Sequence, residues 1–125
     1  MDRVEVASAE CEVPMYLRDH TETSLAARID DLYRAAETSV HEADLKTILA
    51  AKPALMEEWQ SYIEDQRTSD GWYVAVRNVQ QGSPLWIVTR LRDANDIAFD
   101  SRVAAFAALI ARIVGNPLCT TDSGT

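Results

Sequence analysis

The sequence predicts an α+β fold with two or three N-terminal amphipathic helices, an antiparallel two- or three-stranded β-hairpin or meander, and a buried C-terminal helix packed on the sheet. Apolar residues recur with a period near 3.6 from about residue 24, and the period changes to 2 after Gly71. An alanine-rich apolar run then continues to Val114. Helices on one side of an antiparallel sheet define the α+β class.

The length of 125 residues fits one domain and is enough to bury an ordinary core without disulfides or metal. Cys11 and Cys119 lie near opposite ends, so we expect unpaired thiols in a reducing cytoplasm, with a disulfide joining the ends as the alternative. The N-terminus lacks a signal-peptide pattern, and the longest apolar stretch is interrupted by Arg112 and too short to span a membrane. The expected location is therefore the cytoplasm, without membrane attachment.

Residues 1–22 are interpreted as an N-terminal arm or an edge strand. They mix charged residues, a proline and a few apolar residues without a helical period, and Val4 and Val6 alternate with charged neighbours. The single globular domain is therefore expected at residues 23–117. Residues 118–125 are expected to form a disordered tail.

The first helix is predicted at about residues 24–37. A hydroxyl from Thr23 or Ser24 can accept a hydrogen bond from an otherwise unpaired N–H of its first turn. Its apolar residues fall on one face. They are Leu25, Ile29, Leu32, Tyr33 and Ala36.

A second helix is predicted from the capping-box spacing of Ser39 and Glu42, in which each side chain accepts the backbone N–H of the other residue. It should end near Ala51, because Pro53 disfavours the helical conformation in the preceding residue. Pro53 suits the first turn of a third helix, although one long helix kinked there is the alternative. The apolar stripe of this third helix contains Leu55, Met56, Trp59, Tyr62 and Ile63.

Residues 72–77 and 85–91 are predicted to form an antiparallel hairpin. Both segments are rich in aromatic and β-branched residues, and the loop between them contains Gly82 and Pro84. Two strands are marginally stable alone, so a third strand is expected. Residues 97–99 are the main candidate, and the N-terminal arm is the other.

The last helix is predicted to begin at Asp100 or Ser101 and to continue to Val114, where Gly115 and Pro117 supply stop signals. Its apolar residues share one face, and its alanines are small enough for close packing. This helix should lie against the sheet and be the most buried element.

No catalytic, metal or cofactor motif stands out. The two histidines, His20 and His41, lie in no nucleophile motif, and His41, Glu42 and Asp44 are too closely spaced to converge on one metal ion. The glycines occupy turns or the tail rather than a phosphate-binding loop. We therefore expect no cofactor, no metal and no enzymatic activity, with carboxylate acid–base chemistry as the enzymatic alternative.

The acidic charge is confined to residues 1–70, which carry 16 Asp and Glu against 7 Lys and Arg, a difference of −9. The remaining residues carry 4 against 5, a difference of +1, and the whole chain has a net charge of −8. This charge argues against general affinity for nucleic acid, whose binding depends on Lys and Arg. It favours a protein partner with a basic surface, since complementary charge speeds encounter and selects partners.

The expected function is therefore that of a small acidic interaction module of the inhibitor, immunity or anti-defence type, with nucleic-acid mimicry as one way of working. Ten of the 12 cations are Arg and Ala is frequent, which indicates a bacterial or mobile-element origin. The candidate contact residues are acidic side chains at or near the first and third predicted helices. They are Asp30, Asp31, Glu37, Glu57, Glu58, Glu64, Asp65 and Asp70.

The hairpin supports an alternative, a nucleic-acid-binding regulator. Arginines interleaved with aromatic residues on a sheet can stack exposed bases. Aromatic residues in strands more often pack in a core, however, and the acidic end of the chain would repel nucleic acid. The apolar and aromatic residues of the hairpin also fit a homodimer interface, so a homodimer is a further alternative. The residues concerned are Trp72, Tyr73, Arg77, Trp86, Arg90 and Arg92.

Overall fold

The computed structural model describes residues 2–36, 40–64, 71–77, 82, 84–90 and 96–114, and within them it has six helices and one three-stranded antiparallel sheet. This arrangement confirms the predicted α+β fold. The elements are α1 (Arg3–Cys11), α2 (Val13–Asp19), α3 (Leu25–Ala35), α4 (Glu42–Ala51), α5 (Ala54–Glu64), β1 (Trp72–Arg77), β2 (Leu85–Arg90), β3 (Ile97–Phe99) and α6 (Arg102–Ile113).

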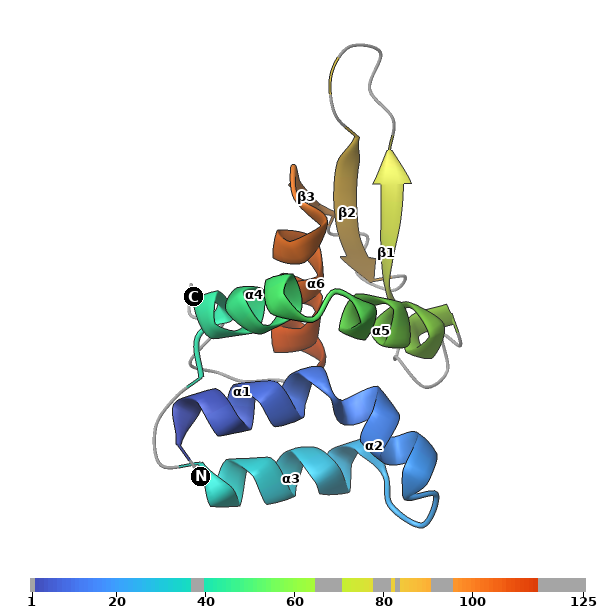
Figure 1. The fold of residues 1–125 in the computed structure, drawn as a ribbon. Helices are drawn as coiled ribbons and strands as arrows, with labels where there is room; N and C mark the ends of the chain where they lie inside the picture. The colour runs from blue at the N-terminus through green and yellow to red at the C-terminus, as the bar shows by residue number, and fades with distance from the viewer. Residues whose placement is uncertain are drawn as a thin grey trace.

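The helices form a body from which the β1–β2 hairpin extends (Figure 1). α1, α2 and α3 make one layer of this body, and α4 and α5 follow one another in a second layer beside it. α6 joins the parts, because it packs against α4 and α5 and also against all three strands. The core therefore runs continuously from the sheet into the helical body.

The N-terminal arm or edge strand predicted at residues 1–22 is wrong, because α1 and α2 occupy this segment. The Asp2 carboxylate accepts the Glu5 N–H at 2.8 Å, and the Glu5 carboxylate accepts the Asp2 N–H at 3.0 Å, so a capping box begins α1. Val4 is 59% exposed whereas Val6 is 1% exposed, but this difference arises from two sides of a helix. Pro14 lies in the first turn of α2, where its missing N–H costs no hydrogen bond.

The next three helices agree with the sequence prediction. Ser24 accepts the Ala27 N–H at 3.1 Å and caps α3. α4 and α5 are separate helices, with Lys52 and Pro53 between them. The predicted capping box of α4 is wrong in register, because Glu42 is the first helical residue and His41 precedes it as the N-cap. Ser39 lies outside the described residues.

The sheet has the order β1-β2-β3, which confirms residues 97–99 as the third strand. Val74 and Val88 pair across β1 and β2, and both are buried in the core. Trp86 pairs with Phe99 across β2 and β3, and both pack against the core. Side chains alternate between the two faces of a strand, and these paired residues lie on the face of the sheet that packs on the helical body.

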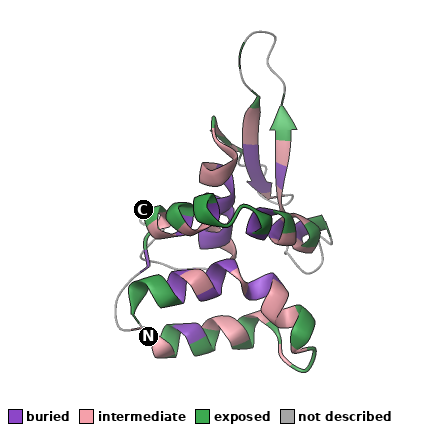
Figure 2. Cartoon of the chain, in the orientation of Figure 1, coloured by how far each residue is buried: buried purple, intermediate pink, exposed green. Residues whose placement is uncertain are grey.

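α6 is the most buried element, as predicted, with all residues from Ala105 to Ala111 buried (Figure 2). It begins after Ser101, whose hydroxyl accepts the Ala104 N–H at 3.2 Å. Its predicted stop signals, Gly115 and Pro117, and the predicted tail at 118–125 lie outside the described residues. None of the helices in the described ranges is long and apolar enough to cross a membrane.

Replacing Ser101 with alanine should lower the free energy of unfolding by about 1 kcal/mol, because the first turn of α6 loses its side-chain acceptor. Threonine keeps a hydroxyl, so Ser101→Thr should retain most of this stability. Urea denaturation of both variants measures the difference. Equal destabilisation by alanine and threonine would contradict a capping role for the hydroxyl.

Candidate acidic interaction surface

The structure describes five of the eight predicted contact residues, and four of these are exposed. Asp30, Asp31, Glu57 and Glu64 are exposed, and Glu58 is half-buried. Glu37, Asp65 and Asp70 lie outside the described residues. The five are contributed by two helices, α3 and α5.

α2 contacts both α3 and α5, and an arginine takes part in each contact. Arg18 of α2 donates to the Glu58 carboxylate of α5 at 2.8 Å. The guanidinium of Arg28, on α3, lies 3.8 Å from the centre of the Tyr16 ring on α2. The acidic faces of α3 and α5 are therefore separated by α2 and do not form one unbroken carboxylate patch.

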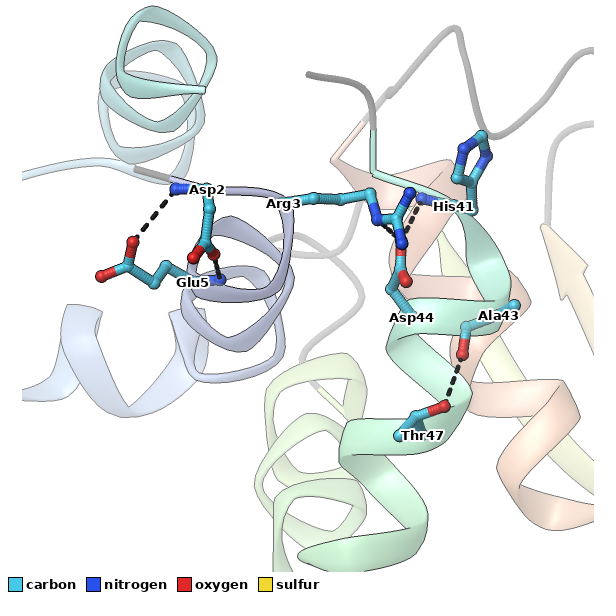
Figure 3. A network of polar contacts seen from close by, with 7 residues as sticks. All are labelled: Asp2, Arg3, Glu5, His41, Ala43, Asp44 and Thr47. Atoms are coloured by element: carbon cyan, nitrogen blue, oxygen red, sulfur yellow. Dashed lines mark hydrogen bonds and ion pairs between the residues drawn. The ribbon is translucent and has the colours of Figure 1, made fainter. Parts of the chain in front are cut away.

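Most cations of the helical body are neutralised within the chain. Besides Arg18, Arg34 pairs with Asp30 at 2.8 Å and Lys52 with Glu12 at 3.8 Å. Figure 3 shows a further pair, in which Arg3 of α1 lies 3.1 Å from the Asp44 carboxylate of α4. Asp44 also accepts the His41 N–H at 2.9 Å, so it fixes both the start of α4 and its contact with α1.

Five exposed carboxylates of the helical body have neither an ion pair nor a capping hydrogen bond within the part of the chain that the structure describes. We call these residues the acidic surface, a set that is distributed over α2, α3 and α5 and the turn after α2 and is not one continuous patch. They are Asp19, Glu22, Asp31, Glu57 and Glu64.

The acidic surface follows from helix spacing. Glu57, Ser61 and Glu64 fall at i, i+4 and i+7 and form the solvent-facing ridge of α5. Asp31 is exposed and lies three residues after Arg28 on α3. Asp19 and Glu22 lie at the end of α2 and in the turn after it.

Sequence reasoning missed Asp19 and Glu22, because they fall in the segment taken for an arm. The signal that could have found them is the Asp2–Glu5 spacing, which is that of a capping box and predicts a helix at the N-terminus. If a helix had been predicted in this segment, Asp19 and Glu22 would have been assigned to the surface at its end.

Two aromatic rings of the hairpin have a guanidinium group of the same chain near their ring centres. The guanidinium of Arg90 lies 5.4 Å from the Trp72 ring centre, and that of Arg102 lies 5.8 Å from the Trp86 ring centre. Arg77 is exposed at the end of β1. Arg92 lies outside the described residues. The intrachain cation–π contacts favour the packing interpretation of these aromatics.

The histidines also make structural contacts. The His20 ring stacks on the Tyr16 ring, with centres 3.9 Å apart and planes 9° apart. His41 is exposed at the N-cap of α4. Within the described ranges, no three side chains of the His, Cys, Asp and Glu types are placed to hold a metal ion.

Cys11, at the end of α1, is buried in the core. Burial, with smaller contributions from the charges of Glu10 and Glu12, raises the pKa of its thiol to about 12. Cys11 is a free thiol, and Cys119, its proposed disulfide partner, lies outside the described residues.

Glu10 is the one carboxylate that is buried in the described part of the chain, with 2% of its surface exposed. Its Oε1 atom has no hydrogen-bond partner among the described residues. Burial raises the pKa of this carboxyl to about 7. Sequence reasoning did not single out Glu10, because it lies in a segment without apparent periodicity.

Comparison with known proteins gave no matching protein family, no similar curated protein and no similar solved structure. No activity, ligand or partner therefore carries over to this chain from a relative.

Proposed function

We propose that this chain is a small acidic interaction module that binds a basic surface on a partner protein and blocks it. An inhibitor, an immunity protein or an anti-defence protein of a bacterium or mobile element would work in this way, in the cytoplasm and without catalysis. The observation that carries the proposal is the acidic surface. Its five carboxylates remain available after the neighbouring cations have been neutralised inside the chain.

The charge of the helical body supports this proposal. The described residues of α1 to α5 and their connections carry 13 acidic against 6 basic side chains, a difference of −7. The described residues from 71 onward carry 2 against 4, a difference of +2. The negative field is therefore concentrated on the helical body, where it can attract a cationic surface and orient it before contact.

On α5, the two carboxylates of the acidic surface are held at a fixed separation along the helix. Glu57 and Glu64 are seven residues apart on one helical face, which corresponds to about 10 Å along the helix axis at 1.5 Å per residue. A helix holds them at this separation without further ordering on binding, which reduces the entropic cost of association. Lysines and arginines at a similar spacing on a partner would each meet a carboxylate.

Charge reversal of the acidic surface is expected to abolish partner capture. The test compares the wild-type protein with the triple variant Asp31→Lys, Glu57→Lys and Glu64→Lys as baits for proteins from the native host at low salt. A basic protein should be retained by the wild type and lost, by tenfold or more, with the triple variant. Its retention should also fall as salt rises, because exposed charges are screened.

The matched control is Asp100→Lys, which reverses an exposed carboxylate outside the acidic surface. The Asp100→Lys variant should capture the same protein at nearly the wild-type level. Glu57→Lys alone should lose more of the captured protein than Asp100→Lys does. Circular dichroism confirms that each bait is folded. The proposal fails if the triple variant retains the partner at low salt, or if Glu57→Lys and Asp100→Lys weaken capture equally.

A further inference from the structure

We propose that two copies of this chain associate through the outer edge of β1, so that their three-stranded sheets join into one continuous antiparallel sheet. This self-association does not depend on the acidic surface or on a basic partner. It follows from the open edge of β1, from the lack of the features that normally block such an edge, and from the exposed end of the hairpin.

β1 is an edge strand, because the sheet has the order β1-β2-β3 (Figure 1). All of its residues, from Trp72 to Arg77, pair with β2 in an unbroken register. No strand among the described residues pairs with the other side of β1. The backbone N–H and C=O groups along an edge of this kind can pair with a further strand.

Proteins usually block an exposed sheet edge with charged residues, with proline, with a bulge or by keeping the strand very short. The edge at β3 is protected in two of these ways, because β3 has three residues and is flanked by Asp96 and Asp100. Residues 72–76 of β1, in contrast, include no charged residue and no proline, and they pair without a bulge. An uncharged strand also does not repel a second copy of itself.

The far end of β1 carries a large exposed apolar side chain. Val76 lies on the face of the sheet that packs on the helical body, since it is two residues after the buried Val74. It is nevertheless 51% exposed, because the hairpin extends beyond the helices. Figure 2 shows the change from buried to exposed along β1. Burial of Val76 against another molecule would therefore be favourable.

A second copy of the chain supplies this burial. Two β1 strands related by a two-fold axis perpendicular to the sheet run antiparallel, and their helical bodies then lie at opposite ends of the joined sheet. The body of each copy therefore lies beside the exposed end of the other hairpin. That end carries Val76 and the cationic Arg77, whereas the described residues of the body carry 13 acidic against 6 basic side chains. Apolar burial and charge complementarity both favour this pairing.

Sedimentation velocity of the full-length protein at increasing concentration tests the proposal. A single strand edge makes a small interface, so we expect a dissociation constant of about 10–100 µM. The measured mass should rise from 13.9 kDa towards twice this value as the concentration passes through that range. A mass that stays at 13.9 kDa up to about 1 mM would overturn the proposal.

Two lysine variants separate the β1 edge from general effects of charge. Val76→Lys places a charge on the exposed end of β1 and should weaken self-association about tenfold or more. Val4→Lys is the matched control, since Val4 is 59% exposed on α1 and the change in charge is the same. It should leave self-association within about twofold of the wild type. With all proteins folded by circular dichroism, unchanged association of Val76→Lys, or equal weakening by both variants, would overturn the proposal.

Amide hydrogen exchange of the wild-type protein locates the contact without any substitution. Protection of residues 72–77 should rise with protein concentration, because the outward N–H groups of β1 become hydrogen-bonded in the dimer. Protection of β2, the central strand, should change far less. The proposal is overturned if the protection gained on association lies outside residues 72–77. It is also overturned if these residues become protected only when a captured basic protein is added.

Discussion

Replacing Trp59 with alanine is expected to lower the free energy of unfolding by about 3–5 kcal/mol, a large share of the stability of a single domain. The side chain is fully buried on α5, and its ring meets the Tyr62 ring edge-on with centres 5.6 Å apart. Its Nε1–H donates to the Cys11 carbonyl oxygen at 2.8 Å. Alanine would leave a cavity between α5 and α1 and would remove this donor.

The hydrogen bond matters because Cys11 is the last residue of α1. Carbonyl groups at a helix end have no partner within the helix, and a buried one costs free energy if it is left unpaired. Trp59→Phe fills most of the volume but has no N–H, so it should cost about 1–3 kcal/mol. Urea denaturation gives both values. A cost below about 1 kcal/mol for alanine would contradict the central packing role of Trp59.

Replacing Glu10 with glutamine is expected to stabilise the protein by about 2–3 kcal/mol at pH 8, with little change at pH 4.5. The pKa of the carboxyl is about 7 in the folded protein and 4.5 as its ordinary value. Between these pH values the folded state keeps a proton that the unfolded state has lost. Stability from this group is therefore complete below pH 4.5, falls as the pH rises to 7, and stays low above that.

Glutamine has nearly the same shape and no charge at any pH, so it removes this dependence. The measurement is urea denaturation of wild-type and Glu10→Gln protein at pH 4.5, 6 and 8. Effects of other titrating groups cancel in the difference between the two proteins at each pH. A stabilisation that is the same at all three pH values would show that glutamine acts through packing rather than through charge.

The helices and strands after residue 24 could be predicted because local signals agree with tertiary packing. Ser24 and Ser101 cap α3 and α6 as their positions suggest. Pro53 separates α4 from α5 for a local steric reason. The change of period after Gly71 reflects strands with one face on the core. Each of these features depends on residues within a few positions of one another.

α1 could not be recognised by its apolar period, because its buried face includes Ala7, Ala9 and the charged residue Glu10. Small and ionisable residues on a buried face do not produce a clear hydrophobic stripe. Their burial depends on α3 and α4, which follow much later in the chain. Sequence patterns therefore gave no sign of this helix beyond the capping box at Asp2 and Glu5.

The candidate carboxylates could be found in the sequence, but their availability could not. Glu58 is paired with Arg18, which is 40 residues away, whereas the adjacent Glu57 has no ion pair among the described residues. Glu58 lies on the side of α5 that faces α2, whereas Glu57 is exposed to solvent. Only the three-dimensional arrangement decides which acidic residues are neutralised within the chain.

The most direct test of the acidic-surface proposal is zero-length carbodiimide cross-linking of the protein to its captured partner. This reagent joins a carboxylate to an amine in contact with it, and mass spectrometry identifies the joined residues. The proposal predicts cross-links from Asp31, Glu57 and Glu64 to lysines of the partner. Cross-links confined to Asp96 and Asp100, near the sheet, with none from the helical body would contradict it.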